Sequence, residues 1–298
     1  MSVLNSLLRA RSFAIVLFCA ALFALSARAQ NNSVRLTPSE VIAGSPELIE
    51  VTAPADAVLS GEWLDRPLHF FPGTDGNSWF ALAGLDVNSK PGDSELRIGV
   101  RLRNGTTRDL STKVKILTGH YKSGTLSVAP KFVEPPPEAM AEIKAEIELK
   151  KRVFASSAED PLWSGNFRVP VTAEPTDSFG TRRTFNGKLA SIHQGMDFRA
   201  ATGTGVRAGN SGTVVLARKL YYEGNCVVID HGLGLFTLSM HLSRIDVIEG
   251  QQVEKGQLLG LSGATGRVTG PHLHWAVRWE GAYLDPAKLF KLDLSRVR

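Results

Sequence analysis

The stretch Gly270-Pro271-His272-Leu273-His274-Trp275-Ala276-Val277-Arg278 predicts a β-strand that carries two histidines. Positions two apart in a strand point to the same face, so His272 and His274 should project together from a run that otherwise suits a sheet. Upstream, His193-Gln194-Gly195-Met196-Asp197 supplies an imidazole and a carboxylate around a turn-forming glycine. Such nitrogen and oxygen donors are the ligands of zinc sites that have three protein ligands and one open position.

The sequence around these residues predicts an antiparallel β domain. From about residue 169 to residue 290, short apolar strands alternate with glycine turns, and no long helical period intervenes. His241 falls in the same region. A zinc site here would use His193, Asp197 and one histidine of the 272/274 pair. The remaining histidines would serve as proton carriers or as donors to an oxyanion.

The N-terminal half predicts a small β-sandwich, which we compare with the immunoglobulin fold. Its strands are short and are separated by turn signals. Residues 95–103 alternate in polarity, Asn104-Gly105 predicts a type I′ hairpin turn, and residues 110–116 alternate back. No combination of residues in this half suggests catalysis.

Between the two halves, three consecutive prolines at 135–137 precede a predicted amphipathic helix at residues 138–154. Its apolar residues recur at helical spacing: Met140, Ile143, Ile147 and Val153. The helix could pack as a connector or cover a cleft. The chain is therefore predicted to divide into a mainly β arrangement of four parts, namely a signal peptide at 1–29, a β-sandwich at 30–130, a Pro-rich linker with a connector helix at 131–165, and a small antiparallel β-sheet domain at 166–298.

The N-terminus has the features of a secretory signal peptide. Arg9 and Arg11 precede an apolar run, and Ala27-Arg28-Ala29 resembles a cleavage site, so the mature chain would keep no membrane span. An uncleaved anchor is the alternative. Cleavage would leave 31 basic and 29 acidic side chains, a balance that gives no reason to expect a nucleic-acid partner. Cys226 would then be the only cysteine, and its surroundings predict a small buried strand residue.

The segment from about residue 168 to residue 290 resembles the lysostaphin-like, or LytM-type, zinc metallopeptidases that hydrolyse peptidoglycan. The resemblance rests on motifs in the family's order and spacing: SFGTR at 178–182, HQGMDF at 193–198, GNCVVIDHGLGLFTLSMHLS at 224–243, and VEKGQLLGLSGATGRVTGPHLHWAV at 253–277. The resemblance implies that His193, Asp197 and His274 bind one Zn²⁺ per chain. It implies that His241 and His272 are catalytic histidines that do not bind the metal.

These roles imply an exported zinc endopeptidase that cleaves peptide stems or cross-bridges of bacterial peptidoglycan, in the periplasm or at the cell wall. The alternative from another class is a non-enzymatic module that binds cell wall or regulates another hydrolase through the same groove. Relatives of that kind lack metal ligands, whereas all five histidine and aspartate positions are present here. The N-terminal domain and the helix could position the enzyme or occlude its groove. Arg267 could contact an acidic peptide stem or simply be a solvated charge.

Overall fold

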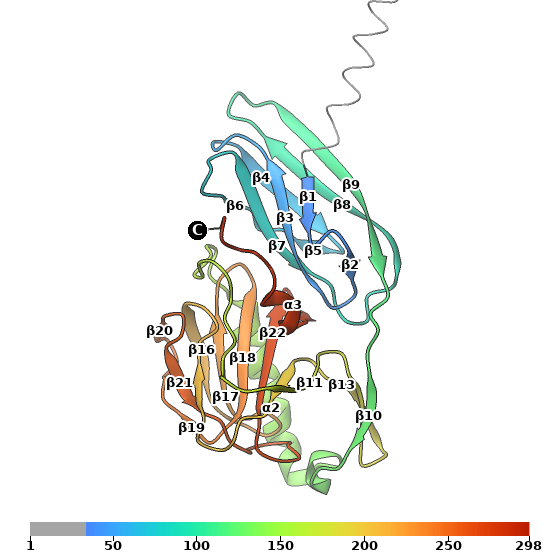
Figure 1. The fold of residues 1–298 in the computed structure, drawn as a ribbon, viewed down its shortest axis with the longest axis vertical. Helices are drawn as coiled ribbons and strands as arrows, with labels where there is room; N and C mark the ends of the chain where they lie inside the picture. Colours follow the sequence, from blue (N-terminus) through green and yellow to red (C-terminus); the bar gives the residue numbers. More distant parts are fainter. Residues whose placement is uncertain (1–33, 298) are drawn as a thin grey trace, which may run out of the picture.

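The computed structural model of the protein describes residues 34–297, and of Leu189 only the backbone. The predicted signal peptide at residues 1–29 lies outside the described residues. Strands predominate, so the prediction of a mainly β protein is confirmed. Among the described helices, none is both long enough and apolar enough to cross a membrane. Figure 1 shows two β-rich halves, with the C-terminal end of the chain running back to the N-terminal half.

The N-terminal half consists of two sheets. One has the order β1 (Val34–Thr37), β3 (Pro46–Thr52), β7 (Ser78–Gly84), β6 (Phe71–Pro72). The other has the order β2 (Val41–Ile42), β9 (Thr107–Leu117), β8 (Gly92–Arg101), β4 (Val58–Trp63), β5 (Arg66–Pro67). Both sheets contribute to one apolar cluster, with Ile49 and Phe80 from the first and Leu96 and Ile98 from the second. This arrangement is what a sandwich requires, and the immunoglobulin-like comparison stays a prediction.

The hairpin between β8 and β9 forms where the sequence predicted it, but the predicted turn type is wrong. A type I′ turn needs positive φ at both central residues, and here Gly105 has a φ of +82° while Asn104 does not have a positive φ. The Gly105 N–H donates to the Leu102 carbonyl at 2.9 Å, so a three-residue loop connects the strands. The Asn104 side chain accepts from the Thr106 N–H at 3.0 Å, a local contact that stabilises this loop.

The C-terminal half is built on one large antiparallel sheet. Its strand order is β11 (Pro175–Asp177), β14 (Met196–Phe198), β22 (Leu273–Trp279), β18 (Leu235–Leu242), β17 (Gly224–Asp230), β16 (Gly212–Leu220), β20 (Gln252–Val253), with β23 (Ala282–Leu284) paired to β22. A second small sheet has the order β15 (Gly205–Arg207), β21 (Leu258–Leu261), β19 (Arg244–Ile245). Cys226 lies buried on β17, as its sequence surroundings predicted.

A third sheet ties the linker to the C-terminal half. β10 (Ser123–Leu126) pairs in parallel with β12 (Arg182–Phe185), which pairs with β13 (Leu189–Ile192). β10 falls inside the range 30–130 that the sequence gave to the sandwich, yet its hydrogen bonds go to the other half. The short 3₁₀ helices η1 (Pro130–Phe132) and η2 (Pro137–Ala139) then lead to α2 (Met140–Ala155). The division of the chain into domains therefore stays a proposal.

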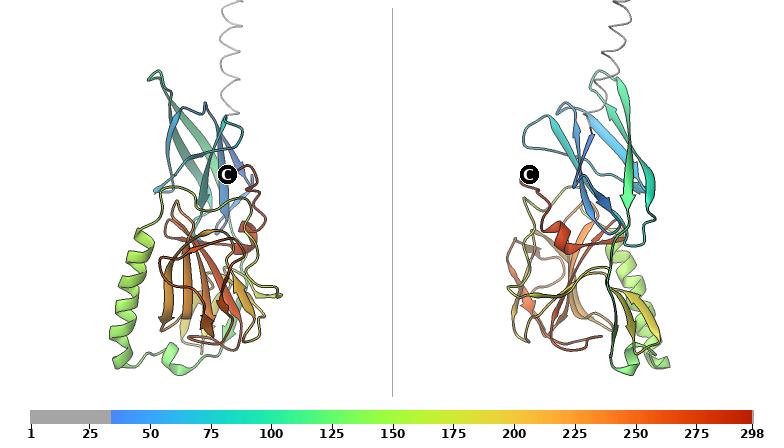
Figure 2. Two further views of the ribbon diagram at one scale, coloured as in Figure 1. Left: turned by 90° about the vertical axis from the view of Figure 1, so that its left-hand side faces the viewer. Right: turned by 45° about the vertical axis from the view of Figure 1, so that its right-hand side comes forward.

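Helix α2 lies beside the large sheet, as Figure 2 shows, and two of its four predicted apolar positions are packed. Ile143 is buried, but Met140 is 52% exposed and Ile147 is 45% exposed. Val153, as predicted, and Phe154 pack on an apolar cluster formed by β16, β17, β18 and β22. The helix packs on the sheet through its C-terminal turns. None of its described residues lines the pocket described below.

The two halves share one continuous apolar core. A single cluster of buried side chains runs from the sandwich into the C-terminal half. At the junction, Phe71 and Trp163 meet edge to face with ring centroids 5.7 Å apart. The last strand-like contact of the chain pairs Val297 with Gly73 of the N-terminal half. α3 (Pro286–Leu289), close to the C-terminus, lies against the same junction.

A buried carboxyl group lies at this junction. Glu47 is 0% exposed, and its Oε1 lies 2.5 Å from the Ser45 hydroxyl. That hydroxyl also lies 2.6 Å from the Ile42 carbonyl oxygen, which can only accept, and its single proton cannot serve both oxygens. Both short contacts of the Ser45 hydroxyl are hydrogen bonds only when Glu47 is protonated and donates to Ser45, and the buried Oε2 of Glu47 has no partner among the described residues. Burial accordingly raises the pKa of Glu47 to about 8, against the opposing pull of Lys288.

We expect Glu47→Gln to stabilise the protein at alkaline pH. Between the ordinary pKa of 4.5 and the folded value of about 8, the folded state holds a proton that the unfolded state has lost. Stability therefore falls as the pH rises through this window, whereas glutamine cannot ionise. The variant should gain about 1–3 kcal/mol of unfolding free energy at pH 9 and little at pH 5. Urea unfolding at both pH values measures this, with the exposed Glu40→Gln as control. An equal gain at both pH values would contradict it.

Candidate metal centre

The fold brings His193, Asp197 and His274 together. Asp197 on β14 is the register partner of His274 on β22, so the sheet itself places the two side by side. His193 lies in the turn that leads into β14. Gly195 makes the close approach possible, because a methyl group there would lie 2.5 Å from Nε2 of His274. All three side chains are buried, and one donor atom of each falls within a common radius suited to a metal ion.

The three donor atoms form a nearly equilateral triangle. His193 Nε2 lies 3.0 Å from Asp197 Oδ1 and 3.0 Å from His274 Nδ1, and the latter lies 2.8 Å from Asp197 Oδ1. Ligands about 2.0–2.1 Å from a tetrahedral zinc ion are about 3.3–3.4 Å apart. The triangle needs only a small expansion to fit the ion.

The tautomer of His193 also fits a cation. Its Nδ1 lies 2.9 Å from the Ser178 carbonyl oxygen, which can only accept, so Nδ1 carries the proton and Nε2 presents a lone pair. That lone pair faces a carboxylate oxygen of Asp197. The buried His231 provides a contrast, because its two ring nitrogens are satisfied by the Ser211 carbonyl and the Thr237 hydroxyl. The His193 arrangement is complete only with a positive charge in the middle, and zinc suits this donor set.

Arg183 and Asp177 lie beside the three donor residues. Arg183 on β12 donates to Asp197 Oδ2 at 2.6 Å and to Asp177 Oδ2 at 2.6 Å. Asp177 also accepts from the Thr181 hydroxyl at 2.8 Å. Because Oδ2 of Asp197 is occupied by Arg183, its Oδ1 is the oxygen that faces the histidines. Arg183 was not predicted from the sequence. It lies on β12, whose pairing with the distant strand β10 leaves no local pattern that would indicate a role in the site.

His241 and His272 stand beside the triangle without joining it. The Nδ1 of His241 donates to the Thr265 carbonyl at 2.8 Å, and the Nδ1 of His272 donates to the Gly270 carbonyl at 2.8 Å. Each ring thus keeps Nε2 free to accept a proton, and that of His272 lies 3.8 Å from Asp197 Oδ1. The two rings are 5.0 Å apart. His241 has a φ of +63°, a conformation that is uncommon outside glycine and is found at functional sites.

The charge states suit metal binding at neutral pH. Burial lowers the pKa of His274 to about 4. Burial, together with the neighbouring His274 and His272, lowers the pKa of His241 to about 3. Burial acts to raise the pKa of Asp197, but the hydrogen bonds to His193 and His274 outweigh it and hold that pKa well below its usual range. At neutral pH His274 therefore offers a neutral imidazole and Asp197 a carboxylate, the forms that bind zinc.

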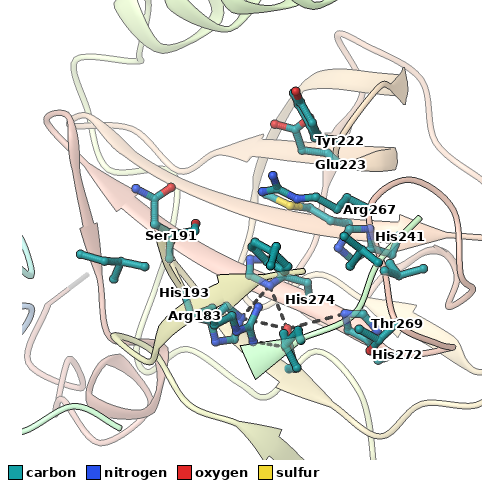
Figure 3. Close-up of a pocket in the computed structure, with 18 of the residues that line it drawn as sticks. Arg183, Ser191, His193, Tyr222, Glu223, His241, Arg267, Thr269, His272 and His274 are labelled. Atoms are coloured by element: carbon teal, nitrogen blue, oxygen red, sulfur yellow. Dashed lines mark hydrogen bonds and ion pairs between the residues drawn. The ribbon is translucent and has the colours of Figure 1, made fainter. Parts of the chain in front are cut away.

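A pocket opens over these groups, and Figure 3 shows their side chains directed into it. Its walls come from several segments far apart in the sequence: Arg183 and Phe185 on β12, Tyr222 and Glu223 before β17, and Arg267 to Thr269 before His272. Leu126, at the end of β10, and Val128, just after it, supply a further wall. Val128 is fixed there by two hydrogen bonds of 2.9 Å with the Asn186 side chain.

Comparison with known proteins gives a family for the part of the chain that contains these residues. Residues 191–286 match the model of peptidase family M23. The chain carries an M23 peptidase domain. The resemblance to lysostaphin-like peptidases that the motifs indicated is thereby confirmed. The matched range contains the three triangle residues and both neighbouring histidines.

Relatives with names are similar to the M23 domain. The chain is 46% identical over 132 residues to the peptidoglycan DD-endopeptidase ShyA of Vibrio cholerae, which covers 43% of this chain and 31% of the relative. It is 40% identical over 98 residues to the DD-carboxypeptidase/endopeptidase Mpg of Neisseria meningitidis, which covers 33% of this chain and 23% of the relative. The chain thus spans less than a third of the length of these curated relatives.

One solved structure resembles most of the molecule. A crystal structure of a Pseudomonas aeruginosa protein assigned to peptidase M23 has a TM-score of 0.63 and 26% sequence identity. The superposition covers 84% of this chain and 95% of that one. The likeness therefore extends well beyond the M23 domain into the N-terminal half.

Proposed function

We propose that the protein is a zinc-dependent endopeptidase that hydrolyses peptide cross-links or bridges of bacterial peptidoglycan. The single observation that carries the proposal is the triangle of His193 Nε2, Asp197 Oδ1 and His274 Nδ1 beside two histidines with free Nε2 atoms. A module that only binds cell wall or regulates another hydrolase would not need both the donor triangle and the two histidines beside it. The peptidoglycan substrate is supported by the names of the relatives, three of which are called peptidoglycan DD-endopeptidases.

In the proposed mechanism, His193, Asp197 and His274 hold one Zn²⁺. When bound, the ion would supply Lewis acidity, which polarises the scissile carbonyl and lowers the pKa of the attacking water. His241 and His272 take the proton from that water, stabilise the tetrahedral oxyanion and return a proton to the leaving amine. Their Nδ1 hydrogen bonds fix the tautomer in which Nε2 is the basic atom. The carbonyls of Thr265 and Gly270 are therefore part of the proposed machinery.

The proposed setting is the periplasm or the cell wall, reached through the signal peptide at residues 1–29. The domain layout we propose keeps a sandwich at 30–130, a linker and helix at 131–165 and the peptidase domain at 166–298. The shared core and the pocket wall formed by Leu126 and Val128 support a role for the N-terminal half in shaping and positioning the peptidase.

Digestion of purified peptidoglycan tests the proposal. The chain without its predicted signal peptide should release soluble muropeptides. A chelator or His193→Ala should lower the release by a factor on the order of 10³, because either removes the proposed metal. The exposed His120→Ala serves as the matched control and should keep full activity. Masses of the products name the bond that is cut. Zinc-loaded protein that releases nothing would contradict the substrate, and protein that binds no zinc would contradict the site.

A further inference from the structure

Arg267 lies in the loop between β21 and His272, and this loop is fixed to the reaction site. The Arg267 N–H donates to the Tyr222 carbonyl at 2.8 Å. The preceding Gly266 has a φ of +77°, and a methyl group there would lie 2.4 Å from the Gly224 nitrogen. Two positions before Arg267, the Thr265 carbonyl accepts from His241. The backbone of Arg267 is thus held at a fixed place relative to a proposed catalytic histidine.

The guanidinium of Arg267 is held between two aromatic rings. Its central carbon lies 4.8 Å from the ring centroid of Phe185 and 4.8 Å from that of Tyr222. Stacking of this kind orients the planar group while leaving its N–H edge available. Figure 3 places Arg267 between Tyr222 and Glu223 on one side and His241 and His274 on the other. The side chain lines the same pocket as the proposed zinc ligands.

This charge has no partner within residues 34–297. No carboxylate oxygen there lies within 4.0 Å of its nitrogens, and its side chain makes no hydrogen bond. Glu223, a neighbouring acid on the pocket wall, is paired with Lys150. Arg183, the other arginine of the pocket, pairs with Asp177 and Asp197. Burial lowers the pKa of Arg267, yet an arginine remains charged at neutral pH. A partly buried guanidinium without a counter-ion is costly unless a ligand supplies one.

We propose that Arg267 binds a free carboxylate of the stem peptide and thereby positions the substrate against His241 and His272. The inference rests on the proposed function and deepens it by naming the feature of the peptide that the enzyme selects. A planar fork held by aromatic rings matches a carboxylate through two parallel hydrogen bonds. Arg267 is therefore a specificity-determining residue, and the solvated-charge interpretation is set aside.

Paired substrates test the inference. Cross-linked muropeptides are compared with versions in which one carboxylate at a time, of the glutamyl residue or of the diamino acid, is a carboxamide. For one of these pairs, kcat/KM of the native protein should favour the carboxylate by about 10–100-fold, the range for a hydrogen-bonded ion pair. Arg267→Gln should reduce that ratio to about 1–3, and Arg267→Lys should give an intermediate value. The pair that responds identifies the carboxylate.

The ratio of two substrates on one preparation does not depend on how much of a variant is folded. Arg199→Gln, an exposed arginine of the same half, is the control and should keep the native ratio. A native ratio near one for every pair, or an unchanged ratio in Arg267→Gln, overturns the inference while leaving the peptidase activity intact. If no peptide is cleaved, the proposed function fails instead. Calorimetric titration of the protein with the same pairs of muropeptides then still tests the inference. Equal affinities for the carboxylate and the carboxamide peptide would overturn the role of Arg267.

Discussion

Replacing His272 with alanine should leave zinc bound at one ion per chain and lower kcat/KM by about 10²–10⁴-fold. Replacing His274 should instead abolish zinc binding. The difference follows from the geometry, because His274 Nδ1 is a corner of the donor triangle while His272 Nε2 stands 3.8 Å from Asp197 Oδ1. Two histidines separated by one residue would thus have separable roles.

Metal analysis after dialysis against a fixed free zinc concentration, together with kinetics on muropeptides, measures both effects. His120→Ala controls for the loss of a histidine from the surface. If the His272 variant lost zinc and the His274 variant kept it, the assignment within the pair would be wrong. Loss of zinc from both would show that the two residues share the metal.

Arg183→Met should weaken zinc binding by about 10–100-fold, the usual effect of losing a group that orients a metal ligand. Arg183 occupies Oδ2 of Asp197 and links it to Asp177. Without it, the Asp197 carboxylate can rotate away from the orientation in which Oδ1 faces His193 and His274. Methionine keeps an unbranched stem in place of the aliphatic part of arginine and removes both ion pairs, so the effect mainly reports charge and hydrogen bonding.

Competition of the protein with a chromogenic chelator measures the zinc affinity directly, independently of turnover. Arg182→Met is the matched control, because Arg182 is the exposed neighbour on the same strand. Arg183→Lys should give an intermediate affinity, since it keeps a charge but cannot bridge both carboxylates as well. Native zinc affinity in Arg183→Met would contradict the positioning role.

Patterns local in the sequence predicted much of the fold. Alternation predicted the hairpin of β8 and β9, because period-two burial is written directly into the residue types. The strand that carries His274 was predicted from a run of residues that suits a sheet, and the structure buries it on both faces. The turn type predicted at Asn104 was wrong, because the dipeptide Asn-Gly suits more than one hairpin loop. Of the four apolar positions predicted for α2, Ile143 and Val153 are packed and Met140 and Ile147 are exposed, since the sheet that the helix packs on decides which side chains are covered.

The candidate site also contains residues that could be predicted from the sequence and residues that could not. His193 and Asp197 could be read from one short motif, and the 272/274 pair from another. The family resemblance implied which histidine of the pair would bind the proposed metal, and the register of β14 on β22 places that residue, His274, beside Asp197. Arg183 and the carbonyl of Thr265 could not be predicted, because they meet the ligands only through pairings between distant segments.

The linker strand β10 has a consequence for how such proteins can diversify. The family match begins at residue 191, so β10, Arg183 and Phe185 lie outside it although they border the metal triangle. A chimera that exchanges residues 191–286 between two relatives would transplant the metal ligands but keep the recipient's flanking wall. Mutations in the linker can therefore reshape the groove without touching the ligands, and selectivity can evolve separately from the chemistry.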